Sequence, residues 1–485
     1  MTLTPTPEQQ KVIDAYSTGN NLIIEAGAGT GKTSTLKMLA QHNTRRRGVY
    51  IAYNRSIAQD AQRGFPQSVL CKTAHALAFA AVGRRYAHRL NSGRVPIRIT
   101  TKILGITDPV KVDDIYLSPY QLARLTMEAI TRFCYSSDDR IHPSHLPYFH
   151  GIQDTARQEL ARYLTPIAQK AWDEDITNPD GQLRFVHDHY LKIWALSRPQ
   201  LPADYVLLDE AQDSNGCVAG LVNHQPAQRI WVGDRAQSIY GWRGATDAMQ
   251  NAPGQRLYLS QSFRFGPRIA AEANKWLAQL DTPMQLRGYD KIPSIVAPLS
   301  APDAVLCRSN AAAMSEVIEA IEQGTSVALV GGGQDIRRFA EAAEQLQAGQ
   351  GTSHPELMAF QTWAQVQDYA DQEPEGSDLR VLVRLVEKYG PRPLIHILDK
   401  LDDEQDAELI VSTAHKAKGR EWDRVRIGSD FFEPKPDENG EVPAPPRPEL
   451  MLAYVAVTRA RTVLDRGSLS WIDTHLARTG GRAAS

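Results

Sequence analysis

The sequence predicts an α/β protein built on parallel sheets. Short apolar runs recur along the chain, and each is followed by a polar or glycine turn and then by a segment of helical composition. This alternation is typical of parallel strands joined by helices. At 485 residues the chain has room for about three domains of roughly 150 residues each. Its 42% hydrophobic and 23% charged residues exclude collagen-like and wholly disordered chains.

The charges nearly cancel, because the chain has 54 Lys and Arg residues and 56 Asp and Glu residues. This balance argues against a protein coated in basic surface, but a narrow basic groove stays compatible with it. No run of 18 apolar residues occurs, and Pro5, Pro7 and Glu8 stand where a signal peptide would need an apolar core. We therefore expect a cytoplasmic protein, associated with the nucleoid in a bacterium or intracellular if phage-encoded.

The cysteines give no sign of a metal or disulfide framework. Neither a CxxC pair nor a nearby histidine at zinc spacing accompanies them. We expect reduced, buried thiols at Cys71, Cys134, Cys217 and Cys307.

The first predicted unit is a strand at Leu22–Ile24, a glycine-rich turn, and a helix from Lys32 to Ala40. The turn matches the phosphate-loop pattern GxxxxGK(S/T), except that Ala26 replaces the first glycine. Its backbone N–H groups would surround phosphate oxygens, Lys32 would reach the β and γ phosphates, and Thr33 would bind Mg²⁺. The predicted nucleotide-binding residues are Ala26, Gly27, Ala28, Gly29, Thr30, Gly31, Lys32 and Thr33.

Further predicted strands at Val49–Tyr53, Tyr205–Leu208 and Arg229–Val232 continue the first sheet. The second of these ends in Asp209 and Glu210, where functional residues of a parallel sheet are expected. Asp209 would hold Mg²⁺ and Glu210 would polarise the attacking water as general base.

The stretch between Gly83 and Pro202 is mostly helical by pattern and begins with the basic segment Arg84–Thr107, which has six Lys or Arg and no acid. A second α/β pattern starts near Leu257. An acidic stretch, Ser353–Ile410, interrupts it with 13 acidic and 5 basic residues. The second pattern predicts helices at Arg268–Leu280 and Ala311–Gln323, a loop at Glu433–Pro448, and strands at Ala304–Cys307, Val327–Val330, Glu408–Ser412 and Arg424–Ile427.

Several longer strings resemble, in order, the signature motifs of superfamily 1 DNA helicases of the UvrD/Rep/PcrA type. They are DEAQD from Asp209, GDRAQSIYGWRGA from Gly233, SFRF from Ser262, STAHKAKGREW from Ser412 and YVAVTRAR from Tyr454. The strings AYNRSIAQDA from Ala52 and KTAHALAF from Lys72 are similar to the F-box DNA helicase branch, although no F-box precedes them.

The resemblance implies two RecA-like P-loop domains with parallel sheets, each carrying a mainly helical insertion. We expect the second insertion to be small and acidic. The expected boundaries are domain 1A at 1–83 and 201–262, insertion 1B at 84–200, domain 2A at 263–345 and 408–485, and a reduced 2B-like insertion at 346–407.

The resemblance also assigns residues to ATP. Gln9 matches the adenine-reading glutamine, Gln237 the γ-phosphate sensor, and Glu421 a ribose or nucleotide contact. Phe263 occupies the place of an adenine-stacking aromatic, although a core role is open to it. Arg264 and Arg459 match the arginines that neutralise the triphosphate during transfer.

For single-stranded DNA the resemblance predicts aromatic stacking and phosphate contacts. The candidate residues are Tyr53, Thr73, His75, Tyr240, Trp242, Arg243 and Thr413. The basic segment Arg84–Thr107 is a further candidate for guiding DNA.

The sequence therefore predicts an ATP- and Mg²⁺-dependent motor that moves on single-stranded DNA, in the 3′ to 5′ direction by resemblance, and unwinds duplexes. We expect a monomer acting on single-stranded and tailed duplex DNA, without a membrane. A translocase that strips proteins such as recombinase filaments is the alternative. A nucleotide-switched binding module and a P-loop small-molecule kinase remain as other classes.

Overall fold

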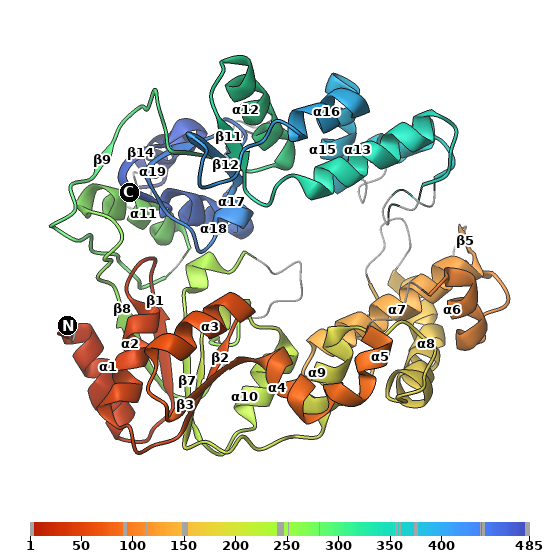
Figure 1. Ribbon diagram of the computed structural model, residues 1–485, viewed down its shortest axis with the longest axis horizontal. Helices are drawn as coiled ribbons and strands as arrows, with labels where there is room; N and C mark the ends of the chain where they lie inside the picture. The colour runs from red at the N-terminus through yellow and green to blue at the C-terminus, as the bar shows by residue number, and fades with distance from the viewer. Residues whose placement is uncertain are drawn as a thin grey trace. The chain divides into compact units, whose positions relative to one another are not determined.

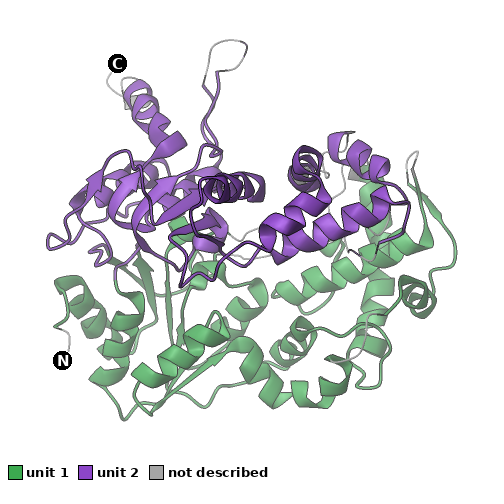
Figure 2. Cartoon of the chain, turned by 45° about the horizontal axis from the view of Figure 1, so that its top comes forward, with its two compact units in different colours: residues 1–26, 31–259 green, residues 27–30, 260–485 purple. Residues whose placement is uncertain are grey.

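The computed structural model describes residues 4–90, 95–112, 115–147, 154–239, 247–250, 252–280, 282–352, 354, 357, 360–372, 377–436, 438 and 442–480. The chain divides into two compact units (Figure 2), the first of residues 1–26 and 31–259 and the second of residues 27–30 and 260–485. Each unit contains one six-stranded sheet.

The sheet of unit 1 has the strand order β3-β2-β6-β7-β1-β8, and all its neighbouring strands are parallel (Figure 1). Its strands are β1 (Leu22–Ala26), β2 (Gly48–Ala52), β3 (Val69–Thr73), β6 (Tyr205–Leu208), β7 (Gln228–Gly233) and β8 (Gln255–Leu259). Every residue of β1, β2 and β6 is buried. This burial on both faces explains why these strands are continuous apolar runs in the sequence.

Alternate residues of these strands enter two different cores. Leu22 and Ile24 pack on one face of the sheet with the helices α1 (Pro7–Ser17), α2 (Lys32–His42) and α3 (Arg55–Gly64). Ile23 lies on the opposite face, in a core that is shared with the helical stretch after β3. This helical stretch is therefore continuous with the hydrophobic core of the sheet.

The helical stretch confirms the predicted pattern but also contains a short antiparallel hairpin, β4 (Val110–Val112) and β5 (Ile115–Leu117). A π-helical turn at Trp172–Ile176 ends its longest helix. Its helices are α4 (Ala74–Ala81), α5 (Ala87–Leu90), α6 (Ile97–Leu104), α7 (Pro119–Tyr135), α8 (Asp154–Ala171) and α9 (His187–Leu196), and α10 (Gly216–Asn223) follows β6.

The sheet of unit 2 has the order β11-β12-β10-β13-β14-β9, again with parallel neighbours. The four strands predicted for this half are all present. The strands are β9 (Ile295–Val296), β10 (Ala304–Cys307), β11 (Val327–Leu329), β12 (Leu409–Thr413), β13 (Trp422–Ile427) and β14 (Ala460–Asp465). Two six-stranded parallel sheets with helices confirm the predicted fold class.

One core of unit 2 joins the sheet to the helices between β10 and β12. The acidic stretch contributes apolar side chains such as Val366, Val383 and Leu394 to this core. The helices of unit 2 are α11 (Pro267–Gln279), α12 (Asn310–Glu322), α13 (Gln334–Gln347), α14 (Trp363–Gln372), α15 (Ser377–Tyr389), α16 (Pro391–Leu398), α17 (Ala414–Ala417), α18 (Arg447–Val457) and α19 (Ile472–Gly480). Because α18 begins at Arg447, the loop predicted up to Pro448 is two residues too long at its C-terminal end.

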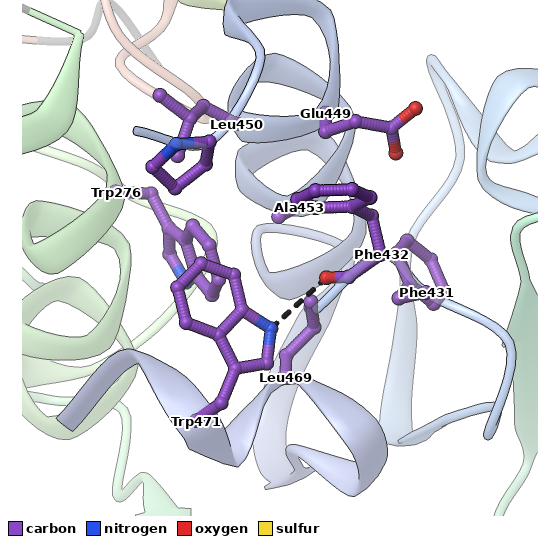
Figure 3. Close-up of a pocket in the computed structure, with 9 residues that line it drawn as sticks. Trp276, Phe431, Phe432, Glu449, Leu450, Ala453, Leu469 and Trp471 are labelled. Carbon is purple, nitrogen blue, oxygen red and sulfur yellow. Dashed lines mark hydrogen bonds between the residues drawn. The ribbon is translucent and has the colours of Figure 1, made fainter. Parts of the chain in front are cut away.

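An aromatic cluster attaches the C-terminal segment to unit 2 (Figure 3). The rings of Trp276 and Trp471 meet edge to face with centroids 5.4 Å apart. The Trp471 indole N–H donates to the Phe432 carbonyl at 3.0 Å, and Leu450 and Leu469 pack beside it. The cluster therefore fixes the segment before α19 by packing and by one hydrogen bond.

The four cysteines are free and buried, as predicted. Burial raises the pKa of both Cys71 and Cys217 to about 11. Burial also raises the pKa of Cys134 and Cys307. Among the residues that the structure describes, no helix is both long and apolar enough to cross a membrane.

Candidate active site

The predicted phosphate loop lies between β1 and α2, as the sequence pattern requires. Gly29 and Gly31 have φ of 72° and 78°, a left-handed conformation that glycine adopts without steric cost. The Thr30 hydroxyl donates to the Gly27 carbonyl at 2.8 Å and closes the turn. No side chain caps the start of α2, and the N-terminus of a helix favours an anion.

The two predicted carboxylates follow β6. Asp209 is 4% exposed and accepts a hydrogen bond from the Tyr50 hydroxyl on the adjacent strand β2. Glu210 has φ 49° and ψ 44°, a left-handed conformation that is rare outside glycine. Such strain costs about 1–3 kcal/mol and persists where the surrounding structure enforces it. The Lys32 ammonium lies 3.5 Å from Glu210 Oε1, so the loop lysine and the carboxylate pair meet.

The electrostatics of this group suit a divalent cation. Burial and the neighbouring Glu210 carboxylate raise the pKa of Asp209 to about 6, although Lys32 and the Tyr50 hydrogen bond act in the opposite direction. Two carboxylates beside one ammonium leave an excess of negative charge that Mg²⁺ would neutralise. The described part of the chain has no cluster of three or more potential His, Cys, Asp or Glu ligands. Mg²⁺ sites in phosphate chemistry commonly need only one or two carboxylates, with phosphates and water completing the shell.

The predicted γ-phosphate sensor lies in a turn directly after β7. Gln237 is 6% exposed, and its Nε2 donates to Asp234 Oδ2 at 2.7 Å. Asp234 Oδ1 accepts from the Ala236 N–H at 3.1 Å, which caps the turn. This turn and the turn that carries Glu210 both follow central strands of one sheet, β7 and β6.

Gln9 lies in the first turn of α1 and is buried. Its Oε1 accepts from the Thr6 N–H at 2.9 Å, and its Nε2 donates to Thr35 Oγ1 at 3.0 Å. The side chain thereby links the start of α1 to the helix that follows the phosphate loop.

Unit 2 brings three of its predicted residues together. Arg264 donates to Glu421 Oε2 at 2.6 Å and to the Thr458 carbonyl at 3.2 Å. Arg459 is 1% exposed, and its guanidinium donates to the Val455 carbonyl at 2.8 Å and to Thr458 Oγ1 at 2.9 Å. Phe263 is 41% exposed and lies against the Tyr289 ring, with centroids 5.6 Å apart.

Residues 27–30 group with unit 2, and their contacts there involve two of its motifs. The Ala28 N–H donates to the Tyr454 hydroxyl at 3.1 Å, and the Phe263 N–H donates to the Gly29 carbonyl at 2.8 Å. A Cβ on Gly29 would lie 2.5 Å from Arg264 Cβ, so glycine is required by the close approach as well as by its φ. The sequence pattern gave no indication of the Tyr454 contact.

The predicted DNA contacts are only partly within the described residues. Tyr53 follows β2 and is 45% exposed. Thr73 and Thr413 cap α4 and α17, accepting from Ala76 N at 3.1 Å and Lys416 N at 3.4 Å. His75 Nε2 lies 3.0 Å from Asp188 Oδ1. The remaining candidates, Tyr240, Trp242 and Arg243, lie outside the described residues.

The basic segment needs one correction. Arg84, Arg85, Arg98 and Lys102 are exposed, and Arg94 lies outside the described residues. Arg89 is 5% exposed and donates to backbone carbonyls, including that of Leu183 at 2.8 Å. It is therefore part of the fold of the helical stretch and is not free to guide DNA.

Sequence reasoning missed two side chains that contact the carboxylates directly. Tyr50 lies inside a buried strand, where an apolar residue would satisfy the same pattern. Gln212 belongs to the DEAQD string, which indicates that it lies close to the carboxylates. The string alone does not say which atoms the side chain contacts. The Tyr50 contact depends on a neighbouring strand of the folded sheet, and the Gln212 contact depends on the turn that follows β6.

A family described as "AAA domain" matches residues 9–243. F-box DNA helicase 1 of Gallus gallus is 28% identical over 95% of this chain and 48% of its own length. F-box DNA helicase protein 1 of Schizosaccharomyces pombe is 26% identical over 94% of this chain and 56% of its own length. DNA helicase II of Haemophilus influenzae is 25% identical over 56% of this chain and 40% of its own length.

This chain spans about half the length of the F-box helicases that it matches. The similarity to these F-box helicases nevertheless extends over almost all of this chain and includes both of its sheets. The order of the motifs and the two parallel sheets agree with these matches, which show that the chain is similar to the F-box DNA helicases over nearly its whole length and to a DNA helicase II over 56% of it.

Proposed function

We propose that the protein is an ATP-dependent DNA motor that translocates along single-stranded DNA and unwinds duplexes. The observation that carries the proposal is the meeting of Lys32 with the carboxylates that follow β6, at 3.5 Å from Glu210. A phosphate loop beside an acidic pair at the end of a buried strand is the arrangement that nucleoside triphosphate hydrolysis needs. The helicase-named relatives make DNA the proposed track.

In the proposed reaction each residue of the nucleotide site has a separate role. Lys32 binds the β and γ phosphates, and the Glu210 carboxylate accepts a proton from the attacking water. Asp209 and Thr33 would hold Mg²⁺, which would neutralise phosphate charge when bound. Gln237 contacts the γ phosphate, and Gln9 binds the adenine.

Arg264 and Arg459 are the proposed guanidinium donors to the triphosphate, because cations stabilise the charge that develops during transfer. Glu421 and Phe263 would contact the nucleoside. For the DNA we propose stacking on Tyr53, Tyr240 and Trp242. Phosphate contacts are proposed for Thr73, His75, Arg243 and Thr413.

The first test is ATP hydrolysis with and without single-stranded DNA. We expect DNA to stimulate turnover, and we expect Lys32→Ala to lower kcat by about 10²–10³-fold, as is typical when one donor to the developing charge is removed. Lys37→Ala is the matched control, because Lys37 lies in the same helix α2. An unstimulated wild-type enzyme would contradict the motor proposal.

The second test is strand displacement on 3′-tailed and 5′-tailed duplexes. We expect unwinding of the 3′-tailed substrate by a monomer. Preference for the 5′ tail would overturn the proposed polarity.

A translocase that strips proteins without efficient unwinding is the second candidate. The specific observation in its favour is the small acidic stretch between β11 and β12, whose helices α14–α16 contribute to the core of unit 2. DNA-stimulated ATPase without strand displacement, together with removal of a filament-forming protein from single-stranded DNA, would favour this candidate.

A further inference from the structure

Gln212 is a fully buried glutamine, two residues after Glu210, in a 3-10 turn at Ala211–Asp213. Its side-chain amide makes three hydrogen bonds. Nε2 donates to Glu210 Oε2 at 2.7 Å and to Asp213 Oδ2 at 3.0 Å, and Oε1 accepts from the Asp234 N–H at 3.1 Å. The amide therefore connects the turn after β6 to the turn after β7.

These partners allow only one orientation of the amide. Its amino group faces two carboxylates, which can only accept when ionised, and its carbonyl faces a backbone N–H, which can only donate. A flipped amide would place its oxygen against carboxylate oxygens and its amino group against an N–H. Gln212 is thus held in one state by both turns.

The consequence for Glu210 is that its two carboxylate oxygens have separate partners. Oε1 lies 3.5 Å from the Lys32 ammonium, and Oε2 accepts from Gln212. When Lys32 binds phosphate, the bond from Gln212 still orients the carboxylate. The left-handed backbone of Glu210 makes this restraint more important, because no regular helix or strand fixes the residue.

Two further features of the turn after β7 accommodate Gln212. A Cβ on Gly233 would lie 2.1 Å from Gln212 Oε1, so the glycine leaves the space that the amide occupies. The Ser238 hydroxyl donates to the Gln212 backbone carbonyl at 3.1 Å. Asp234 also accepts from Gln237, so the amide contacts the same turn as the predicted γ-phosphate sensor.

We propose that Gln212 is a positioning residue for ATP hydrolysis, which aligns the Glu210 carboxylate with the attacking water and ties it to the Asp234–Gln237 turn. The inference rests on the proposed function, because it assumes that Glu210 is the general base. Gln212 itself would touch neither nucleotide nor water. Its loss should therefore lower kcat and leave ATP binding intact.

The test is Gln212→Met, which keeps the length of the side chain and removes all three hydrogen bonds. We expect kcat with single-stranded DNA to fall at least about 10-fold, while KM for ATP and the equilibrium affinity for a fluorescent ATP analogue change less than about threefold. Gln212→Glu keeps an acceptor for the Asp234 N–H but loses the donor to Glu210, so it should lose kcat as well.

Gln225→Met is the matched control. Gln225 is also buried in unit 1 and also makes three hydrogen bonds, with Leu201 N at 2.8 Å, the Pro199 carbonyl at 2.8 Å and the Leu221 carbonyl at 2.9 Å. It lies at the end of α10, away from the carboxylates. We expect a comparable loss of Tm in both methionine variants and a loss of kcat in Gln212→Met alone.

Rates are expressed per nucleotide-binding site, titrated with the analogue, so that an unfolded fraction does not count as lost catalysis. An unchanged kcat per site in Gln212→Met, or an equal fall in Gln225→Met, would overturn the inference and leave Gln212 as a structural residue. A wild-type protein without DNA-stimulated hydrolysis would instead refute the proposed function, so the two failures are distinguishable.

Discussion

At the scale of single residues, the helical stretch of unit 1 contains a buried histidine whose ring accepts a backbone hydrogen bond. His189 is 2% exposed, and its Nδ1 accepts from the Val186 N–H at 3.2 Å. Burial lowers its pKa to about 4, Asp188 partly offsets this effect, and Arg89 and Arg184 add to it. The folded protein therefore holds His189 neutral at pH values where an unfolded chain would protonate it.

This difference predicts a pH dependence of stability. Between the ordinary histidine pKa of about 6.5 and the folded value, the unfolded chain binds a proton that the native protein does not bind. The free energy of unfolding should therefore fall as the pH is lowered through this window, by about 1–2 kcal/mol near pH 5.5 from this group. Urea unfolding at pH 7.5 and pH 5.5 measures it.

We expect His189→Gln to show a smaller change in unfolding free energy between the two pH values. The exposed His224→Gln is the control and should keep the full change. Equal pH dependence in wild type and His189→Gln would show that other groups cause the effect.

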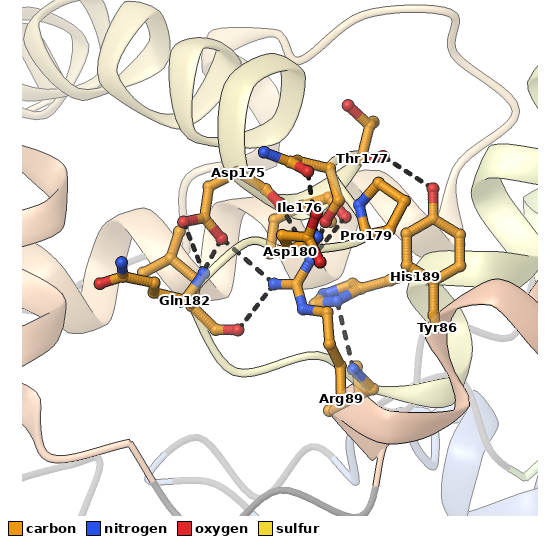
Figure 4. A network of polar contacts seen from close by, with 12 residues as sticks. Tyr86, Arg89, Asp175, Ile176, Thr177, Pro179, Asp180, Gln182 and His189 are labelled. Carbon is orange, nitrogen blue, oxygen red and sulfur yellow. Dashed lines mark hydrogen bonds and ion pairs between the residues drawn. The ribbon is translucent and has the colours of Figure 1, made fainter.

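At the scale of elements, α5 and the π-helical turn at Trp172–Ile176 are joined by one side chain (Figure 4). The Arg89 guanidinium donates to the carbonyls of Asp175 at 2.9 Å and Ile176 at 3.2 Å, and it pairs with the Asp175 carboxylate at 3.1 Å. Carbonyls at a helix end have no partner within the helix, and the planar guanidinium supplies several donors at once.

We expect Arg89→Met to destabilise unit 1 by about 3–5 kcal/mol, because it leaves the part-buried Asp175 carboxylate without its cation and several carbonyls without their donor. The exposed neighbour Arg85→Met should cost less than about 0.5 kcal/mol. Thermal unfolding measures both.

A DNA-binding test of the basic segment should accordingly change Arg84 and Arg85 and leave Arg89 in place. Loss of Arg89 would unfold part of the protein, and the unfolding could be mistaken for weaker DNA binding.

The elements also explain how far the sequence was informative. β1, β2, β6 and β10 were predicted within one or two residues because central parallel strands are continuously apolar. β3, β8, β9 and β14 were not predicted; the first three lie at sheet edges, whereas β14 lies between β13 and β9. Edge strands are half exposed and carry polar residues such as Lys72 in β3, so their pattern resembles that of a loop.

The same reasoning applies to the candidate site. Lys32, Asp209 and Glu210 follow strands with strong local patterns, and the structure brings them together as expected. The contacts of Tyr50 and Gln212 were not predictable, because each joins two strands that are more than 20 residues apart in the chain. Sequence patterns identify the groups that do chemistry more readily than the groups that orient them.

At the scale of the whole molecule, each unit has its own sheet and its own hydrophobic core. Chains of this kind commonly depart from two-state unfolding, because each core can be lost separately. A single melting temperature would then not describe both units. A probe that belongs to one unit alone is needed to follow them separately.

The buried cysteines provide such probes. Cys71, Cys134 and Cys217 lie in unit 1, and Cys307 is the one cysteine of residues 260–485. Because thiol reagents attack the exposed thiolate, and because both burial and a raised pKa suppress that form, we expect native labelling to be at least about 100-fold slower than labelling in urea. Mass spectrometry of the modified peptides measures it, and fast labelling of the native protein would contradict it.

Since reaction requires local opening, the labelling rates of Cys307 and of the other three thiols measure the opening free energies of the two units within one unmodified chain. Thiol labelling at these four positions therefore gives the same kind of information about local opening as amide hydrogen exchange. Adding nucleotide or single-stranded DNA to the same experiment would show which unit each ligand stabilises, without any engineered label.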